Sequence, residues 1–294
     1  MRQSTEILCL NLSWQLWKGH KMTKKKKRII ITLIIAIIVI LLDMWGFAMK
    51  KEYYAIESDK INKGLRIVFI SDLHNSFYGG TDQSGIIDAI RDENPDIVLF
   101  GGDMIDRQGG TKYALRLMGE IVKDYPCIYT PGNHEMGRSD YKDFFNEVDK
   151  LGVKHLKGGY SELEVNGQKV RVYGVYDAYY KSHLKKCFKT LDDSCYNILL
   201  AHQPEQYETL LDSGDTKFDL ILSGHAHGGQ WRIPFILDQG IYAPDQGIFP
   251  DRTNGRFDYD GGVQIVSRGL ARQLKMIVIP RIFNRPELSV IEIE

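Results

Sequence analysis

The sequence has few cysteines and no Cys-x-x-Cys pair. Its four cysteines are Cys9, Cys127, Cys187 and Cys195, and their spacing excludes the usual thiolate sites for structural zinc. Cys187 and Cys195 are close enough along the chain to form a local disulfide if the domain lies in an oxidising compartment. The alternative is that the three domain cysteines are unpaired, partly buried thiols.

The sequence also lacks internal repeats and a net charge. No low-complexity linker divides residues 60–294, so 294 residues with 43% hydrophobic content indicate one large α/β domain plus an anchor. The zero net charge hides an asymmetry, because residues 1–51 hold ten Lys or Arg and two acidic residues, and the remainder holds 28 basic and 36 acidic ones. This acidic balance argues against binding of nucleic acid through a broad basic face.

A long apolar run follows a cluster of cations near the N-terminus. Lys24 to Arg28 are five consecutive cations, and Ile29 to Met49 is interrupted only by Thr32 and Asp43. At about 1.5 Å per residue, a helix of this length spans about 30 Å, the thickness of a bilayer core. Because the cations before the run outnumber those after it, we expect a cytoplasmic N-terminus and an extracytoplasmic domain at the cell membrane.

These features predict four segments. They are a cytoplasmic tail at 1–28, a single-pass transmembrane anchor at 29–49, a short linker at 50–63 and a catalytic domain at 64–294. Met22 is a natural start for a signal anchor, and we expect translation to begin there. The alternative is a cleaved signal peptide, because Ile29 to Leu42 is short and Gly46-Phe47-Ala48 resembles a cleavage site.

Short apolar runs alternate with stretches of helical period in the domain, which predicts a largely parallel sheet covered by helices. The predicted strands are Arg66–Ile70, Asp96–Phe100, Cys127–Thr130, Val170–Val175, Asn197–Ala201 and Asp219–Leu222. The predicted helices are Ser84–Asp92, Lys112–Lys123, Tyr141–Leu151 and Glu205–Leu211. The runs Gly261–Ser267 and Leu288–Glu294 predict further strands, antiparallel and closing a second sheet.

Polar motifs follow several of these predicted strands. They are Asp72-Leu73-His74, Gly102-Asp103-Met104-Ile105-Asp106, Gly132-Asn133-His134-Glu135, His202 and Gly224-His225-Ala226-His227. Ligands of open α/β sheets bind at the carboxyl ends of the strands, so we expect these loops to converge on one site. Their oxygen and imidazole donors suffice for two divalent ions, which predicts metal-assisted hydrolysis of phosphoesters.

Spacing within the motifs supports this interpretation. In Asp72-Leu73-His74 and His225-Ala226-His227, the first and third residues share one face of an extended backbone and could reach one ion. Gly101 and Gly102 allow the backbone to approach a metal pair closely, which makes Asp103 the natural bridging ligand. The two domain histidines outside the motifs, His155 and His183, are expected at the surface.

The five motifs, in this order, resemble those of the calcineurin-like metallophosphoesterase superfamily. Gly224–Gln230, Ser267–Leu270 and Asn284–Glu287 resemble its membrane-anchored bacterial branch, with Ala226 where that branch often has Thr. The resemblance implies a four-layer α/β/β/α sandwich of two mixed β-sheets. It also implies that a hydroxide bridging two metal ions hydrolyses phosphoester, phosphodiester or pyrophosphate bonds.

The resemblance also assigns roles to single residues. The implied metal ligands form two sets that share one member, Asp72, His74, Asp103 and His227 for one ion and Asp103, Asn133, His202 and His225 for the other. Manganese, iron, zinc and cobalt all suit such donors. His134 is then free to act as a general acid, and we expect Asp106 to orient it and to raise its pKa.

The expected substrates are phosphorylated small molecules or lipid-linked and cell-envelope compounds, because the anchor holds the site near a membrane. A phosphoprotein phosphatase or a nuclease would use the same metal core, and a catalytically silent, metal-stabilised binding module is an alternative of another class. Arg232 and Arg268 could bind substrate phosphate, or they could form structural ion pairs. The sequence does not indicate an oligomeric state.

Overall fold

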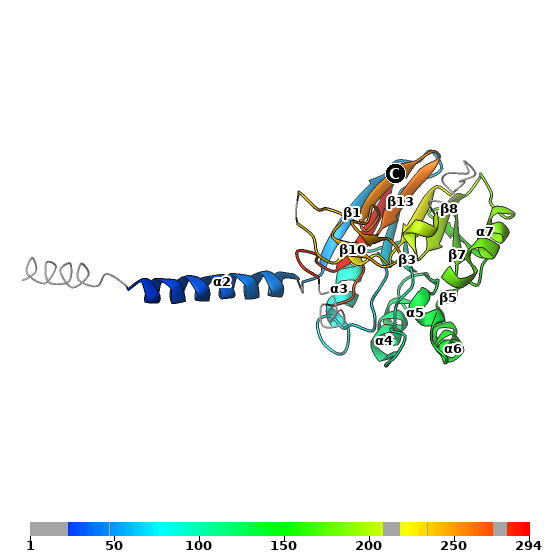
Figure 1. Cartoon of the computed structure of the whole chain (residues 1–294). Coiled ribbons are helices and arrows are strands. Elements are labelled where there is room, and N and C mark those ends of the chain that lie inside the picture. Colours follow the sequence, from blue (N-terminus) through cyan, green and yellow to red (C-terminus); the bar gives the residue numbers. More distant parts are fainter. Residues whose placement is uncertain (1–22, 47, 208–217, 234, 273–280) are drawn as a thin grey trace, which may run out of the picture. The chain divides into compact units, whose positions relative to one another are not determined.

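A computed structural model describes residues 23–46, 48–207, 218–233, 235–272 and 281–294 (Figure 1). The chain divides into two units between Met44 and Trp45. In the first unit, helix α2 (Lys24–Gly46) holds the cations and the apolar run. Within the described residues, no helix has both the length and the apolar character needed to cross a bilayer. The predicted anchor at 29–49 and the predicted start at Met22 include residues outside this description.

The first sheet of the second unit places a parallel core beside one antiparallel neighbour. Its order is β1 (Lys50–Ile56), β14 (Glu287–Ile293), β2 (Leu65–Ile70), β3 (Ile97–Phe100), β4 (Cys127–Tyr129) and β5 (Lys154–His155). Strands β2 to β5 are parallel, whereas β14 runs antiparallel to β2 and parallel to β1. The apolar runs form strands because they are rich in β-branched residues and are buried on both faces.

The second sheet also has a parallel core, and an antiparallel strand lies at each of its edges. Its order is β12 (Gly255–Tyr259), β13 (Gly262–Val266), β9 (Leu220–Ser223), β8 (Tyr196–Ala201), β7 (Gln168–Val175) and β6 (Tyr160–Val165). Strands β13, β9, β8 and β7 are parallel. The edge strands β12 and β6 form antiparallel hairpins with their neighbours.

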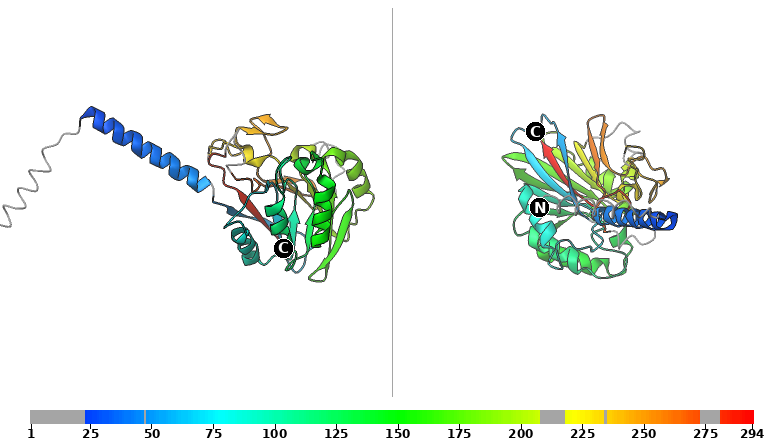
Figure 2. Two further views of the ribbon diagram at one scale, coloured as in Figure 1. Left: turned by 90° about the horizontal axis from the view of Figure 1, so that it is seen from below. Right: turned by 90° about the vertical axis from the view of Figure 1, so that its left-hand side faces the viewer.

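The two sheets face each other and carry helices on their outer faces. In β2, Ile67 and Phe69 pack between the sheets, whereas Val68 and Ile70 pack against helices α3 (Ser84–Glu93), α4 (Lys112–Ile121) and α6 (Tyr141–Leu151). These cyan to green helices gather on one side of the strands (Figures 1 and 2). Helix α7 (Tyr180–Phe188) packs on the outer face of the second sheet. The expected four-layer sandwich of two mixed sheets is therefore confirmed.

Three features of the fold differ from the sequence-based expectations. Residues 50–56, expected to be linker, form the edge strand β1. Strand β14 lies inside the first sheet, and β13 pairs in parallel with β9, so the prediction of two antiparallel C-terminal strands in a second sheet was only partly correct. Cys127, Cys187 and Cys195 are buried free thiols, so the Cys187–Cys195 disulfide does not form.

The two histidines outside the motifs are buried, contrary to expectation. His155 and His183 are 7% and 8% exposed. The ring of His155 packs 4.3 Å from that of Phe145, and its Nε2 lies 2.6 Å from the Tyr176 hydroxyl. Burial lowers the pKa of His155 to about 4, although the Asp149 carboxylate opposes that shift. The imidazole is therefore neutral in the folded protein at neutral pH.

We expect His155 to make the protein less stable in acid. Its folded-state pKa lies below its ordinary value of 6.5, so its stabilising effect is complete above pH 6.5 and is lost as the pH falls toward about 4. The full loss is about 3 kcal/mol. Urea unfolding of the wild type and of His155→Gln at several pH values measures it, because other titrating groups cancel in the difference. Parallel pH profiles for the two proteins would contradict the prediction.

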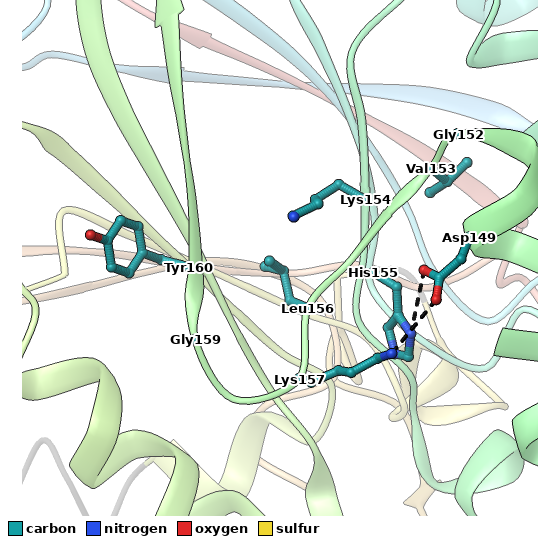
Figure 3. A pocket seen from close by; sticks show the side chains of 9 residues that line it. All are labelled: Asp149, Gly152, Val153, Lys154, His155, Leu156, Lys157, Gly159 and Tyr160. Atoms are coloured by element: carbon teal, nitrogen blue, oxygen red, sulfur yellow. Dashed lines mark ion pairs between the residues drawn. The ribbon is translucent and has the colours of Figure 1, made fainter. Parts of the chain in front are cut away.

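A surface hollow with a volume of ≈ 630 Å³ lies beside this histidine (Figure 3). It is lined by residues between Asp149 and Tyr160, at the end of α6 and along β5. Asp149 forms an ion pair with Lys157 at 3.6 Å and lies 3.9 Å from Nδ1 of the neutral His155. Dashed lines mark both contacts in Figure 3. None of the motif residues lines this hollow.

Candidate metal centre

The predicted metal ligands lie just after the carboxyl ends of strands from both sheets. Asp72 and His74 follow β2, Asp103 follows β3, Asn133 follows β4, His202 follows β8, and His225 and His227 follow β9. Hydrogen bonds join these loops to one another. The Asp72 backbone N–H donates to the Gly102 carbonyl at 2.9 Å, and the His225 backbone N–H donates to the Asp72 carboxylate at 2.9 Å. The structure thus brings all five motifs together.

The backbone at this site is strained. Asp72, His74, Asp103, His225 and His227 all have φ between 48° and 66°, the left-handed region that non-glycine residues rarely adopt. Each such residue costs on the order of 1–3 kcal/mol and persists only where surrounding contacts enforce it. Five of the seven predicted ligands share this conformation, which directs side chains from separate loops toward one point.

Gly102 shows how closely these loops approach one another. A Cβ atom at this position would lie 2.6 Å from the Gly132 nitrogen and 2.7 Å from Nδ1 of His202. Only glycine therefore fits between the loops that follow β3, β4 and β8. This close packing places Asp103 at the centre of the site.

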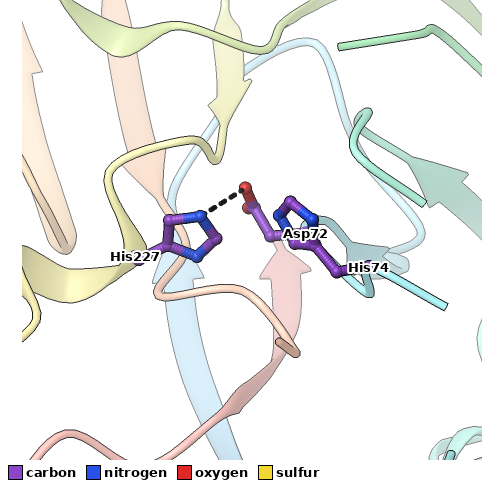
Figure 4. A group of neighbouring side chains, drawn as sticks. All are labelled: Asp72, His74 and His227. Atoms are coloured by element: carbon purple, nitrogen blue, oxygen red, sulfur yellow. Dashed lines mark ion pairs between the residues drawn. The ribbon is translucent and has the colours of Figure 1, made fainter. Parts of the chain in front are cut away.

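One group of donors consists of Asp72, His74 and His227 (Figure 4). Their ligand atoms lie within 4.8 Å of one another, and His227 Nε2 is 3.8 Å from Asp72 Oδ1. His74 Nε2 is buried, lies 3.8 Å from Asp103 Oδ2 and has no hydrogen-bond partner among the described residues. A buried nitrogen lone pair beside two carboxylates is suited to a cation.

A second group consists of Asp103, His202 and His225. His202 Nε2 lies 3.2 Å from Asp103 Oδ2. The Asn133 side-chain amide lies 3.0 Å from His225 Nδ1 and 3.2 Å from Asp103 Oδ2 on one side, and 3.2 Å from Nη2 of Arg107 on the other. With its nitrogen toward His225 and Asp103, the amide donates a hydrogen bond to each of them. With its oxygen toward them, three lone pairs face one another, an arrangement that suits a bound cation.

The ligand histidines are oriented through their second ring nitrogens. Nδ1 of His202 lies 2.8 Å from the Gly101 carbonyl, and Nδ1 of His74 lies 2.7 Å from the Asp106 carboxylate. Each Nδ1–H therefore donates outward and leaves Nε2 as a lone-pair donor. His225 is held the opposite way, because its Nε2 lies 2.8 Å from Asp245 and its Nδ1 faces Asn133.

Asp103 is the point at which the two groups meet. Its Oδ2 lies 3.2 Å from His202 Nε2, 3.8 Å from His74 Nε2 and 3.9 Å from His134 Nε2. Two donors that bind one ion at about 2.1 Å lie roughly 3 to 3.5 Å apart. The separation of Asp103 from His202 falls in this range, and that from His74 lies slightly above it. Burial raises the pKa of Asp103, but the facing imidazoles of His202, His134 and His74 lower it well below its usual range.

Asp106, which was expected to orient His134, contacts His74 more closely. Asp106 Oδ1 accepts from His74 at 2.7 Å and stands 4.0 Å from His134 Nδ1. His134 has a lowered pKa, because burial outweighs the opposing charge of Asp103. Asp106 is therefore a positioning residue for a metal ligand. His134 remains at the rim, with its side chain 30% exposed.

Glu135 has a structural role that the sequence did not reveal. Its buried carboxylate accepts from the backbone N–H groups of Asp103 at 2.9 Å, Gly132 at 3.0 Å and Ile105 at 3.1 Å. It thereby joins the loop after β3 to the start of helix α5 (Asn133–Met136). The capping pattern Gly-x-x-Glu at a helix start was the available signal.

We expect Glu135→Ala to lower the free energy of unfolding by about 2–4 kcal/mol, because three buried N–H donors lose the carboxyl group that accepts from them. Urea unfolding in the presence of a chelator measures this effect without any contribution from metal binding. Glu164→Ala, on the half-exposed strand β6, serves as the control. Equal stability of the two variants would contradict the role assigned to Glu135.

Two arginines considered for phosphate binding have other partners. Arg268 is buried and pairs with Glu287 and Glu52, each at 2.7 Å. Arg232 donates to the Asn254 side chain at 2.8 Å. The structural interpretation therefore fits Arg268. Asp245, which contacts His225, was missed because the irregular stretch after Gln230 carries no motif or period.

Comparisons with known proteins agree with this geometry. A model of the family "Calcineurin-like phosphoesterase" matches residues 65–229. An uncharacterized metallophosphoesterase of Helicobacter pylori (strain J99) is 33% identical over 193 residues, which cover 61% of this chain and 48% of that protein. The uncharacterized metallophosphoesterase YkuE of Bacillus subtilis is 29% identical over 240 residues, covering 77% and 78%.

A third relative carries the name "Transmembrane protein with metallophosphoesterase domain" and comes from Danio rerio. It is 26% identical over 225 residues, covering 70% of this chain and 51% of that protein. The chain thus spans about half the length of the Helicobacter and Danio relatives. The family match extends over more than half of the chain and includes every motif that meets at Asp103, and the chain therefore belongs to the calcineurin-like phosphoesterase family.

Proposed function

We propose that this protein is a dinuclear metal-dependent phosphoesterase. The observation that carries the proposal is the convergence of buried carboxylate and imidazole donors on both sides of Asp103, with Nε2 of His74 and of His202 lacking a hydrogen-bond partner among the described residues. When bound, two divalent ions would polarise phosphoryl oxygens and lower the pKa of a water molecule between them. Asp72, His74, Asp103 and His227 would hold one ion, and Asp103, Asn133, His202 and His225 the other.

The chain's own residues supply orientation and a proton. The Gly101 carbonyl and the Asp106 and Asp245 carboxylates fix the rings of His202, His74 and His225. His134 lies at the rim, and its Nε2 is 3.9 Å from Asp103 Oδ2. From there it can donate a proton to the departing oxygen of a bound phosphoester.

We further propose a membrane location and a lipid-linked or cell-envelope substrate. The cation run followed by the apolar run in α2 supports the location, and so does the name of the Danio relative. The acidic balance of residues 52–294 disfavours a nuclease. Retention of His134, which is dispensable for holding ions, favours an enzyme over a silent binding module.

Hydrolysis of bis-p-nitrophenyl phosphate by the purified full chain tests the activity. We expect no turnover after treatment with a chelator, and recovery on addition of manganese, iron, zinc or cobalt. Phosphomonoesters, phosphodiesters and lipid pyrophosphates assayed with the best metal then define the substrate class. A metal-loaded protein that hydrolyses none of them would refute the proposal. A truncated form would have to retain Lys50, because β1 begins there.

A further inference from the structure

An irregular segment beyond the last metal ligand exposes large apolar side chains. Phe235, Ile236, Ile248 and Phe249 are 97%, 75%, 70% and 65% exposed. All four belong to residues 231–249, which contain the short hairpin β10 (Tyr242–Ala243) and β11 (Gly247–Ile248). Soluble proteins rarely expose such a group of side chains unless it binds a membrane or another protein.

Backbone contacts join the segments that carry these exposed side chains. Tyr242 pairs with Ile248 across the hairpin, the Ile241 N–H donates to the Trp231 carbonyl at 2.9 Å, and Trp231 bridges to Ile282. Trp231, Tyr242 and Ile282 are themselves 42%, 36% and 38% exposed. We call residues 231–233 and 235–249 together with Ile282 and Phe283 the apolar surface.

The apolar surface borders the metal centre. Asp245, in the turn of the hairpin, is the residue whose carboxylate lies 2.8 Å from His225 Nε2. The Asn284 amide, next to Phe283, donates to the His227 carbonyl at 2.6 Å and to the Gln230 carbonyl at 3.1 Å. A ligand bound at the apolar surface would therefore lie beside the metal ligands.

The apolar surface also borders the point where the chain enters the catalytic unit. Arg285 donates to the carbonyls of Ala48 and Met49 at 2.9 and 3.1 Å, and the Lys50 N–H donates to the Pro286 carbonyl at 2.8 Å. The yellow to orange segment with β10 is drawn on the side where β1 begins (Figures 1 and 2). Residues 48–50 are thus bound to Arg285 and Pro286, which follow Phe283 closely in the chain.

The sequence preceding residue 48 indicates the occupant. In α2, five cations precede an apolar run, and the described apolar side chains from Ile29 to Ile37 are all exposed. A helix that is apolar on every side requires an apolar environment. Tryptophan and tyrosine, present here as Trp231 and Tyr242, favour the boundary between lipid and water. One environment, a bilayer, would satisfy both the helix and the apolar surface.

We propose that the apolar surface rests on a lipid bilayer and inserts Phe235, Ile236, Ile248 and Phe249 into its interfacial region. This inference rests on the proposed membrane location and deepens it, because the metal centre then opens toward the headgroups. The phosphate of a membrane-embedded substrate could reach the metal ligands without leaving the lipid. The apolar surface only binds the membrane, and the proposed catalytic role stays with His134 and the metal ligands.

The test measures where Phe235 lies when the full chain is reconstituted in vesicles of phosphatidylcholine and phosphatidylglycerol. Phe235→Cys in a Cys9→Ser background receives a nitrobenzoxadiazole label, since Cys127, Cys187 and Cys195 are buried. Nitroxide-labelled phosphatidylcholine serves as the quencher. The matched control is Tyr179→Cys, an exposed aromatic position of the η1 turn (Asp177–Tyr179). Ile248→Cys provides a second position on the apolar surface.

We expect the labels at 235 and 248 to emit at shorter wavelength and to be quenched several-fold more strongly than the label at 179. Equal quenching at all three positions would overturn the proposal. A shift in emission without quenching by the lipid would also overturn it, because a second copy or another protein would then cover the surface. Neither the emission wavelength nor the quenching depends on turnover, and the diester assay requires no membrane. The membrane contact and the proposed activity can therefore fail separately.

Discussion

Asp103→Asn is expected to abolish metal binding and activity together. Asp103 faces donors of both groups, with Oδ2 3.2 Å from His202 and 3.8 Å from His74. An amide would place a neutral group where, in the proposed dinuclear centre, two cations would share a carboxylate. Loss of several kcal/mol of electrostatic stabilisation corresponds to a fall in kcat/KM of about 10³-fold or more. Elemental analysis should show well under one metal ion per chain.

A second readout separates metal loss from misfolding. Manganese should raise the Tm of the wild type, because an ion that binds only the folded state stabilises it, and it should leave the Tm of Asp103→Asn unchanged. Asp124→Asn, at a surface ion pair with Arg91, is the matched control and should behave as the wild type. If Asp103→Asn keeps two ions and its turnover, the bridging role is wrong.

The sequence predicted the site better than it predicted the sheet around it. Apolar runs such as Ile97–Phe100 predict buried strands, and the polar residues that follow them must then meet at the carboxyl ends of a parallel sheet. This rule depends on local pattern alone. It therefore placed all seven expected ligands in one site, without knowledge of which strands are neighbours.

The pairing of strands that are distant in the sequence could not be predicted in this way. Strand β14 lies between β1 and β2 because its register pairs Glu287 with Lys50 and Ser289 with Phe69. Nothing local to any of these strands specifies that arrangement. Strand β1 begins Lys-Lys-Glu, and its burial alternates only partly, so it resembles a linker. Edge strands of this kind acquire their structure from their neighbours.

The local sequence pattern also did not predict which side chains contact each other. Asp106 was expected to orient His134, but its hydrogen bond is with His74 at 2.7 Å, and it lies 4.0 Å from His134 Nδ1. Asp245 reaches His225 from an irregular segment with no periodicity. In both cases a long-range contact determines the partner. Spacing therefore identified ligands, whereas the groups that orient them required the structure.

His134→Gln is expected to keep both metal ions and to lower kcat by about 10² to 10⁴-fold, the usual contribution of a general acid. Its ring Nδ1 has no hydrogen-bond partner among the described residues, and its contact with Asp103 Oδ1 is made by the backbone N–H at 2.8 Å, which glutamine preserves. Metal content should therefore match the wild type. Steady-state kinetics with elemental analysis measure both quantities, and His183→Gln, at a buried histidine outside the site, is the control.

The dependence on leaving group distinguishes a proton donor from a residue that only shapes the site. A general acid matters most when the departing oxygen is strongly basic, so His134→Gln should lose far more activity toward alkyl phosphodiesters than toward bis-p-nitrophenyl phosphate. A residue that merely positions substrate or metal would lower both rates by the same factor. Only proton transfer couples this imidazole to the basicity of the departing oxygen, so equal losses would assign His134 to substrate binding. An undiminished kcat would remove it from the mechanism.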